Sequence, residues 1–548
     1  MSAEYPDASQ LDAIADQAGD SPRRRIGLGG LIFGTMASII GSGWLFGPML
    51  AAQKAGPAAI IAWPIAGILF ALMALCYAEL GAMFPVSGGV VRFPHYAFGA
   101  VASAVIGWII YIGAVTFPAI EVEAALQYAT SYLPWAFTHK VASGASQVVV
   151  LTGFGYVVAA VLMVLFAVIN LLGVELFVRA NNTIMVFKLF VMAAVAVMFF
   201  ATAFHPDRLT AFGGFAPNGV SGILTAIVSG GVAFAFTGFQ QPVAVAGEVR
   251  DPERNIPRAL LWGLGITSLI YLLLQLAFLC GLPAESLAGG WSKLNFQGDF
   301  GPLAGLATLL GLGWLATLLY IDAVVSPADC GLNWAMMTSR ISYGMAENGS
   351  APRFMARLNL KGVPWISVLV STVVGLFLFL PFPGWQVFVS FITSAAVLSY
   401  GTGPLAHAAL RRQLPDQRRP FRTVAGDLVP FLAFYAANLL VVWGGWETTE
   451  KLLIATVVGA VLFFLRQLGG GTRPDRAQWV AASWLVPWLV GLGLVSWLCT
   501  FGDKPLGVIP FGWSFLVVFA LSTLVYLLAV RTRLPHALTE TVSLARSR

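Results

Sequence analysis

Long apolar runs separated by short polar segments extend along most of the chain. A helix that crosses a bilayer needs about 20 apolar residues, and most runs approach or exceed that length. The short segments of alternating polarity that build a membrane β-barrel are absent from the sequence. The pattern therefore predicts an all-α polytopic membrane protein. Its fourteen predicted spans are residues 28–50, 58–82, 98–126, 152–173, 181–203, 219–246, 257–281, 303–338, 364–381, 384–410, 427–446, 451–466, 478–500 and 511–530.

Helix-breaking residues interrupt two of these spans near the middle. Residues 41–43 (GSG) lie within the first span, and residues 237–239 (TGF) lie within the sixth. A glycine costs a helix ~1 kcal/mol relative to alanine, and a bilayer holds no water to satisfy the freed backbone groups. Interrupted helices at corresponding places in two halves of a chain indicate the binding site of a secondary transporter.

The spacing of the breaks predicts two inverted repeats of five helices each. Ser42 and Gly238 are 196 residues apart, and Glu121 and Asp322 are 201 residues apart. Spans one to five are then mirrored by spans six to ten, because span one starts inside and span six starts outside. Broken helices 1 and 6 would meet near the midplane of the membrane.

The chain is predicted to contain a functional core and a peripheral unit. The last four spans carry no ionisable residue at mid-helix, so they are interpreted as a scaffold or as the contact of a homo-oligomer. The predicted segments are a disordered cytoplasmic tail (1–25), a ten-helix transport core (26–412, with repeats at about 26–205 and 215–412), a cytoplasmic linker (413–426), four peripheral helices (427–535) and a second cytoplasmic tail (536–548).

Charge is scarce and unevenly distributed. Only 10% of the residues are charged, whereas a soluble domain carries about 25%. Of the 31 Lys and Arg residues, 24 fall in segments that the span count places inside, and 6 fall outside. This asymmetry predicts that both termini are cytoplasmic and that the protein lies in a cell membrane, a bacterial inner membrane being favoured. The basic residues lie in short loops rather than on one face, so nucleic acid is not an expected partner.

Five ionisable residues lie inside predicted spans, where each charge costs at least ~2.5–3.5 kcal/mol. They are Glu121, Glu123, Lys188, Asp322 and Asp329. Lys188 lies about 10 Å deep in the fifth span. Its long stem allows it to snorkel to the surface, and the alternative is a desolvated ammonium that loads and releases a proton.

The acidic residues can either carry protons or pair with other buried polar groups. Glu121 and Glu123 point about 200° apart on a helix, so only one of them is expected to face the site. Asp322 and Asp329 share a helix face with Ser326, and this polar stripe suggests an ion site or a polar path. The predicted proton-coupling residues are Lys188, Glu121, Glu123 and Asp322.

Four stretches match motifs of one transporter family. They are residues 41–47 (GSGWLFG), 77–85 (YAELGAMFP), 234–239 (FAFTGF) and 247–258 (GEVRDPERNIPR). Over roughly residues 25–410 the chain resembles the amino acid–polyamine–organocation (APC) superfamily of permeases, and it looks closest to the aspartate:proton symporter branch. Two features depart from the usual pattern: the family commonly has about twelve spans, and the buried acidic residues are unusual.

The resemblance implies a five-plus-five inverted-repeat fold that works by alternating access. It implies that the substrate's carboxylate binds the amides of Ser42 and Gly43, at the positive end of a half-helix. Backbone carbonyls of both breaks, including those of Ile39 and Phe234, would face the substrate's ammonium. The predicted substrate-binding residues are Ile39, Ile40, Gly41, Ser42, Gly43, Glu121, Phe234, Ala235, Phe236, Thr237 and Gly238.

Two residues gain a specific role from the resemblance. Phe234 matches an aromatic gate, and its alternative is plain helix packing. Lys188 matches a lysine that takes the place of a sodium ion in relatives, which favours proton coupling over sodium coupling.

Together these features predict a secondary active transporter that imports an acidic or neutral amino acid by proton symport. Carboxylates lining the site could instead select a cationic amino acid or a polyamine for transport or exchange. A membrane sensor that kept the fold and lost transport is a remote alternative. The sequence has no HExxH motif and no Ser/His dyad, so neither an enzyme nor a metal site is expected. The proton is the expected coupling ion and no cofactor is required; the expected partners are the amino acid and the lipid bilayer.

Overall fold

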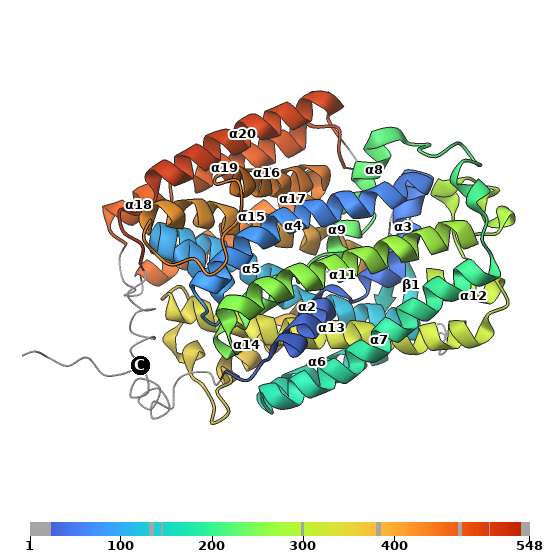
Figure 1. The fold of residues 1–548 in the computed structure, drawn as a ribbon, viewed down its shortest axis with the longest axis horizontal. Coiled ribbons are helices and arrows are strands. Elements are labelled where there is room, and N and C mark those ends of the chain that lie inside the picture. The colour runs from blue at the N-terminus through green and yellow to red at the C-terminus, as the bar shows by residue number, and fades with distance from the viewer. Residues whose placement is uncertain are drawn as a thin grey trace, which may run out of the picture.

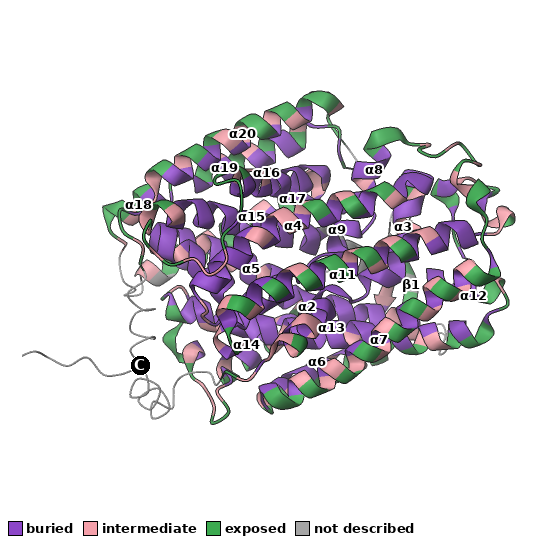
Figure 2. Ribbon diagram, viewed as in Figure 1, coloured by how far each residue is buried: buried purple, intermediate pink, exposed green. Residues whose placement is uncertain are grey.

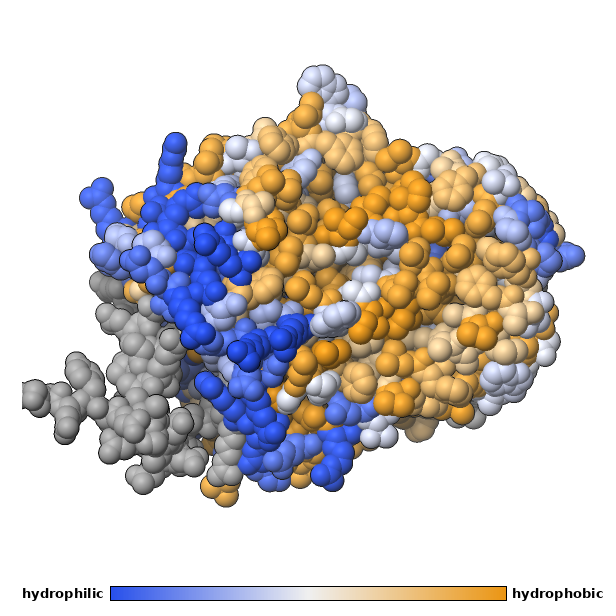
Figure 3. Space-filling model, viewed as in Figure 1, coloured by the Kyte–Doolittle hydropathy of each residue, from blue (hydrophilic) through white to orange (hydrophobic). Residues whose placement is uncertain are grey.

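The computed structural model describes residues 24–130, 136–143, 146–296, 301–379, 385–468, 474–502 and 505–538. Most of its helices run along the longest axis of the molecule (Figure 1). Apolar side chains cover the middle of the molecule, and hydrophilic side chains gather at one end (Figure 3). We call this end, which holds the Arg-rich segment 411–422, the basic end.

The structure is helical almost throughout the described residues. Length and composition qualify nine of the described helical segments as membrane spans, and four apolar helices of 10–17 residues are shorter. The predicted all-helical membrane architecture is therefore confirmed, while the count of fourteen spans stays a prediction. The described α-helices are α2 (Leu28–Ile39), α3 (Gly43–Ala55), α4 (Ala59–Met83), α5 (Gly89–Ala129), α6 (Gly153–Leu171), α7 (Val174–Thr202), α8 (Gly219–Val228), α9 (Val232–Ala235), α10 (Gln241–Ala244), α11 (Pro252–Gly281), α12 (Pro302–Leu309), α13 (Gly313–Glu347), α14 (Trp365–Phe377), α15 (Trp385–Gln413), α16 (Leu428–Trp443), α17 (Trp446–Leu468), α18 (Arg476–Ala481), α19 (Leu485–Leu498) and α20 (Phe511–Thr532).

Both predicted helix breaks are present. The first break, residues 40–42, separates α2 from α3. The second break, residues 236–240, separates α9 from α10, and Gly238 within it has a φ of 101°. A further interruption at residues 229–231 divides α8 from α9. The sixth predicted span is thus a chain of three short helices.

The helices at the other two unusually long predicted spans, 98–126 and 303–338, are also irregular. Gly99 lies inside α5 with non-helical angles (φ 80°, ψ −169°), so α5 bends there. The predicted span 303–338 is wrong in its bounds, because it covers two helices, α12 and α13, and α13 continues to Glu347. Gly311 has a φ of 75°, a conformation that ends a helix, and it lies between them.

The structure also contains a small β-hairpin, which the predicted all-α class does not include. Strands β1 (Thr138–Ser143) and β2 (Ser146–Leu151) pair antiparallel between α5 and α6. Consecutive valines at 148–150 favour an extended backbone, and the segment is too short to span a membrane. The search for long apolar runs therefore assigned no element to it.

Helices from the two predicted repeats pack against their counterparts. The third predicted span, α5, lies along the eighth, α13, and the second, α4, lies along the seventh, α11. Two repeats related by a two-fold axis would bring equivalent helices together in this way. Helices α2, α5 and α13 are largely buried, whereas α6, α7 and α20 expose one face (Figure 2). Helices α16, α19 and α20 gather on one side of the molecule (Figure 1).

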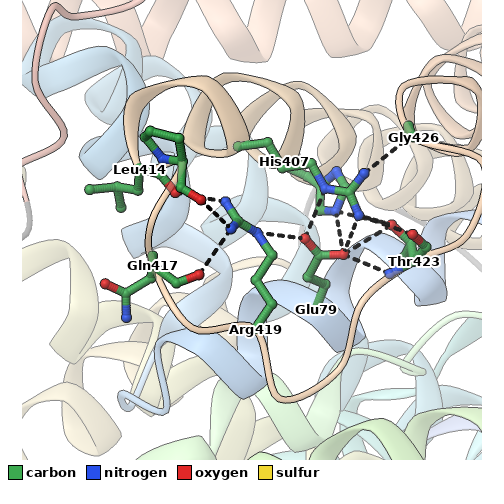
Figure 4. Close-up of polar contacts among 9 residues, drawn as sticks. Glu79, His407, Leu414, Gln417, Arg419, Thr423 and Gly426 are labelled. Carbon is green, nitrogen blue, oxygen red and sulfur yellow. Dashed lines mark hydrogen bonds and ion pairs between the residues drawn. The ribbon is translucent and has the colours of Figure 1, made fainter.

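A buried carboxylate fastens the segment after α15 to α4 at the basic end (Figure 4). Glu79 of α4 accepts hydrogen bonds from Arg411 (2.6 and 2.9 Å) and from the backbone amide of Thr423 (2.7 Å). His407 Nε2 and Arg419 Nε lie 3.1 and 3.3 Å from its oxygens. A buried carboxylate is stable only when donors surround it, and here they come from the end of α15 and from the linker that leads to α16.

The close contact between the two breaks predicts an intolerant glycine. A Cβ on Gly238 would lie 2.2 Å from the carbonyl oxygen of Ser38, whereas a Cβ on Gly231 would meet nothing within 4 Å. Both glycines have positive φ, which costs an alanine about 1–2 kcal/mol. We expect Gly238→Ala to lower the thermal unfolding midpoint of the detergent-purified protein far more than Gly231→Ala. Equal midpoints for the two variants would contradict this close contact.

Candidate functional site

Two buried side chains of opposite charge lie at the two ends of the first break. The amide N–H of Ser42, at the start of α3, donates to Glu121 Oε2 at 2.7 Å. The carbonyl of Ile40, just after α2, accepts from Lys188 Nζ at 2.6 Å. A helix carries a partial positive charge at its start and a partial negative charge at its end. Each side chain therefore faces the helix end of complementary charge.

Three further side chains donate to carbonyls at the end of α2. Trp334 Nε1 and Cys330 Sγ lie 3.1 and 3.4 Å from the carbonyl oxygen of Ser38. The Tyr271 hydroxyl donates to the carbonyl of Ile39 at 3.2 Å. Sequence reasoning missed these donors because each residue also suits an apolar core. Their position at mid-span was the available signal, since Trp and Tyr of membrane proteins concentrate at the interfaces.

Lys188 is fully buried and forms an ion pair. Its ammonium lies 3.0 Å from Asp329 Oδ2, and both side chains are 0% exposed. It also lies 3.4 Å from the carbonyl oxygen of Ser326. The side chain therefore does not snorkel to the surface, while its role in loading and releasing a proton stays a prediction. Removing one partner of such a pair leaves an uncompensated buried charge.

Asp322 is a second buried carboxyl group on α13. It is 0% exposed, and neither of its oxygens has a hydrogen-bond partner among the described residues. The Ser326 hydroxyl lies nearby, but the two groups do not meet the geometry of a hydrogen bond. Lys188 is the charged neighbour that Asp322 shares with Glu121. The predicted polar stripe of Asp322, Ser326 and Asp329 thus lies beside the ion pair.

The two glutamates of α5 are separated as predicted. Glu121 reaches the first break, where a Cβ on Gly41 would lie 2.5 Å from its Oε1. Glu123, two residues later on the same helix, is also buried, at 3% exposure. The structure brings Glu121, Lys188, Asp322 and Asp329 together around one break.

The predicted binding carbonyls and amides are engaged within the protein. The Ser42 amide, predicted to bind the substrate's carboxylate, holds Glu121 instead. The Phe234 carbonyl, predicted to face the ammonium, accepts from Thr237 Oγ1 at 2.6 Å. A Cβ on Gly43 would lie 2.9 Å from the Cα of Ala235, so the residues that flank the two breaks touch directly.

The aromatic residues of the second break have different surroundings. Phe234 stacks on Phe117 at 5.6 Å between ring centroids, and Phe117 stacks on Trp334 at 3.6 Å. Phe236 lies 5.7 Å from the rings of both Phe70 and Tyr271. Phe236, predicted to bind substrate, therefore belongs to an aromatic cluster. The gate role of Phe234 stays a prediction.

Ion pairs and backbone hydrogen bonds close the basic end. Arg340 Nε lies 2.8 Å from Glu248 Oε1, and both side chains are almost fully buried. The backbone amides of Arg25 and Ile26 both donate to the Glu248 carbonyl, at 2.8 and 2.9 Å. The start of α2 is thereby fastened to the segment that precedes α11.

Two interrupted helices that meet at a buried cluster of charges define the class of discontinuous-helix secondary transporters. A family model described as amino acid permease matches residues 26–464. The chain therefore belongs to the amino acid permease family of the APC superfamily, as the motifs predicted.

The relatives of this chain are transporters. It is 36% identical to the glutamate/serine transporter AimA of Bacillus subtilis (strain 168), over 93% of this chain and 94% of the relative. It is 34% identical to the aspartate-proton symporter of the same organism, over 92% and 96%. It is 25% identical to the mouse large neutral amino acids transporter small subunit 2, over 83% of each chain. The protein is thus a multi-pass membrane protein that transports amino acids, and it is not an enzyme.

The buried ion pair predicts strong energetic coupling. Lys188→Met or Asp329→Asn alone leaves one buried charge unpaired, which costs about 3–5 kcal/mol. We expect the double variant to unfold at a higher temperature than either single variant. The half-exposed pair of Arg412 and Asp427 is the matched control, because such pairs contribute below about 1 kcal/mol. Additive losses for Lys188 and Asp329 would show that the two groups do not depend on each other.

Proposed function

We propose that this protein imports an acidic or neutral amino acid by proton symport. The observation that carries the proposal is the hydrogen bond from the Ser42 amide to Glu121 Oε2. The amide at the start of a half-helix is the expected anchor for the substrate's carboxylate. In the structure this anchor holds a carboxylate of the protein itself.

Competition for this anchor would link substrate binding to a proton. Two carboxylates that share one buried donor repel each other strongly, so one of them takes up a proton or leaves. If Glu121 takes up the proton, it releases the Ser42 amide and the substrate's carboxylate takes its place. Each ligand then raises the affinity for the other, because binding couplings are reciprocal.

The second half of the cycle uses the charges on the other side of the break. Lys188 donates a hydrogen bond to the carbonyl of Ile40 and forms an ion pair with Asp329. A change in the protonation of Lys188 would therefore alter its contact with the backbone of the first break. Asp322 lacks a hydrogen-bond partner among the described residues, and an ionised carboxylate in such a place costs several kcal/mol. We infer that Asp322 is a second proton carrier beside Lys188.

In alternating access, one gate at the basic end and one on the opposite side would open and close in turn. The fastened basic end, with the Glu248–Arg340 pair, is the gate that opens for release. On the positive-inside rule we propose that this end and both termini face the cytoplasm, and a bacterial inner membrane is the proposed location. Phe234 would close the opposite side over the bound amino acid.

The known substrates of two relatives, as their names give them, support the choice of substrate. One is a glutamate/serine transporter and the other an aspartate-proton symporter. In addition, Glu121 is already held by an amide, which makes it a poor ligand for a cationic amine. Acidic and small polar amino acids are therefore the proposed substrates.

The competition between Glu121 and the substrate predicts a pH-dependent affinity. Binding of radiolabelled aspartate, glutamate or serine should strengthen as the pH falls, because protonated Glu121 releases the Ser42 amide. In Glu121→Gln the affinity should lose this pH dependence. The control is Glu285→Gln, which removes an exposed carboxylate between α11 and α12 and should keep the pH dependence of the wild type. An unchanged pH dependence in Glu121→Gln would reject the role of Glu121.

Lys188 should separate binding from coupling. We expect Lys188→Ala to retain some substrate binding but to lose accumulation driven by an inward proton gradient in proteoliposomes. The loss follows because the ammonium that links Ile40 to Asp329 is gone. Counterflow of labelled substrate without a gradient measures the residual exchange. Full gradient-driven accumulation by this variant would rule out proton coupling through Lys188.

A further inference from the structure

Two buried asparagines lie beside the ion pair of Lys188 and Asp329. Asn333 follows Asp329 by one turn on α13, and Asn181 precedes Lys188 by two turns on α7. Their exposed fractions are 0% and 1%. The two helices are thus joined twice, by an ion pair and by a neutral pair of amides.

The amide nitrogen of Asn333 faces more acceptors than it can serve. Asn333 Nδ2 lies 2.8 Å from Asn181 Oδ1, 2.9 Å from the Asp329 carbonyl oxygen and 3.5 Å from Asp329 Oδ1. An amide nitrogen carries two hydrogens, so two of the three acceptors are served well at a time. The Asp329 carboxylate has the longest of the three contacts. In this arrangement its main donor is Lys188, at 3.0 Å from Oδ2.

The side-chain oxygen of Asn333 does not hold the amide group in its present orientation. Asn333 Oδ1 has no hydrogen-bond partner among the described residues. Turning the amide toward the carboxylate therefore breaks no bond on its oxygen side. A buried carboxylate that loses its cation requires another donor, and a hydrogen bond to a charged group is stronger than one between neutral groups.

We propose that Asn333 is a positioning residue that takes over the Asp329 carboxylate when Lys188 gives up its proton. Asn181 holds one N–H of Asn333 away from the carboxylate while the ion pair is intact. In the step itself the N–H bond of the ammonium breaks, the proton passes to water on the release side, and Asp329 remains ionised. The two amides thereby set the pH at which Lys188 is discharged. This inference rests on the proposed proton symport.

Other titratable groups surround the pair and stay unchanged in the test. Glu121 on α5 and Cys330 on α13 are in electrostatic contact with Lys188, as is Asp322. Helices α2, α10, α12 and α14, which pack on α13, contain no ionisable side chain. The remaining ionisable residues on elements packed against α13 or α7 include Glu123 on α5, Tyr156 on α6, Tyr271 on α11 and Arg353 on η6 (Arg353–Ala356).

The proposal predicts opposite effects for the two asparagines. Asn333→Leu removes the replacement donor, so Lys188 holds its proton more tightly. The pH of half-maximal aspartate uptake should rise by about one unit. Asn181→Leu frees one N–H of Asn333 for Asp329 Oδ1, which stabilises the discharged state and should lower that pH. The measurement is gradient-driven uptake of radiolabelled aspartate into proteoliposomes across a pH series.

Asn170→Leu is the matched control. Asn170 is a buried asparagine of α6 whose amide donates to the Phe166 carbonyl (2.9 Å) and lies 3.5 Å from that of Leu332 on α13. Its hydrogen bonds go to these two backbone carbonyls, so its replacement should leave the pH midpoint unchanged. If Asn333→Leu does not fold, the proposal is tested by Asn181→Leu alone, in which the pH of half-maximal uptake should fall.

Three results would overturn the proposal. They are shifts of the same sign in both variants, unshifted midpoints in folded and active variants, or an equal shift in Asn170→Leu. If uptake by the wild type does not depend on the proton gradient, the proposed symport itself is overturned, and this inference with it.

Discussion

The constraint on which the structure depends is the need to satisfy backbone groups of a helix that is interrupted inside a membrane. The bilayer core holds no water that could form hydrogen bonds with the carbonyls at the end of α2 or with the amides at the start of α3. The protein supplies Lys188 and two aromatic donors on one side of the break and Glu121 on the other. The long helices α5, α7, α11 and α13 bring these side chains to the break, and each charge matches the dipole of the helix end that it faces.

The same arrangement explains why an amino acid and a proton would move together. The groups that stabilise the break in the absence of substrate are the groups that a substrate needs. A carboxylate that enters the site must displace Glu121, and an ammonium that approaches α2 meets carbonyls that Tyr271 and Lys188 already occupy. In the proposed mechanism, substrate binding would replace these internal contacts, and protonation would lower the cost of that replacement.

The sequence allowed prediction of the parts that depend on local chemistry. Glycines at mid-span located both breaks. Lys188, Glu121 and Asp322 were identified because a charge inside a membrane span has a high free-energy cost. The partners of these groups depend on how distant helices pack, which a single sequence does not reveal. For that reason the occupation of the Ser42 amide by Glu121, the donors Tyr271 and Trp334, and the amide pair of Asn181 and Asn333 emerged only from the structure. The division of α12 from α13 and the β-hairpin were missed because the search favoured long apolar runs.

The most direct test of the exchange at Ser42 counts protons. A pH indicator in weakly buffered detergent solution reports the protons that the purified protein takes up when saturating aspartate or serine is added. The exchange predicts uptake of about one proton per substrate bound in the wild type, because one carboxylate replaces another at a single buried donor. It predicts none in Glu121→Gln. Substrate binding by the wild type without proton uptake, at a pH where Glu121 is ionised, would contradict the account.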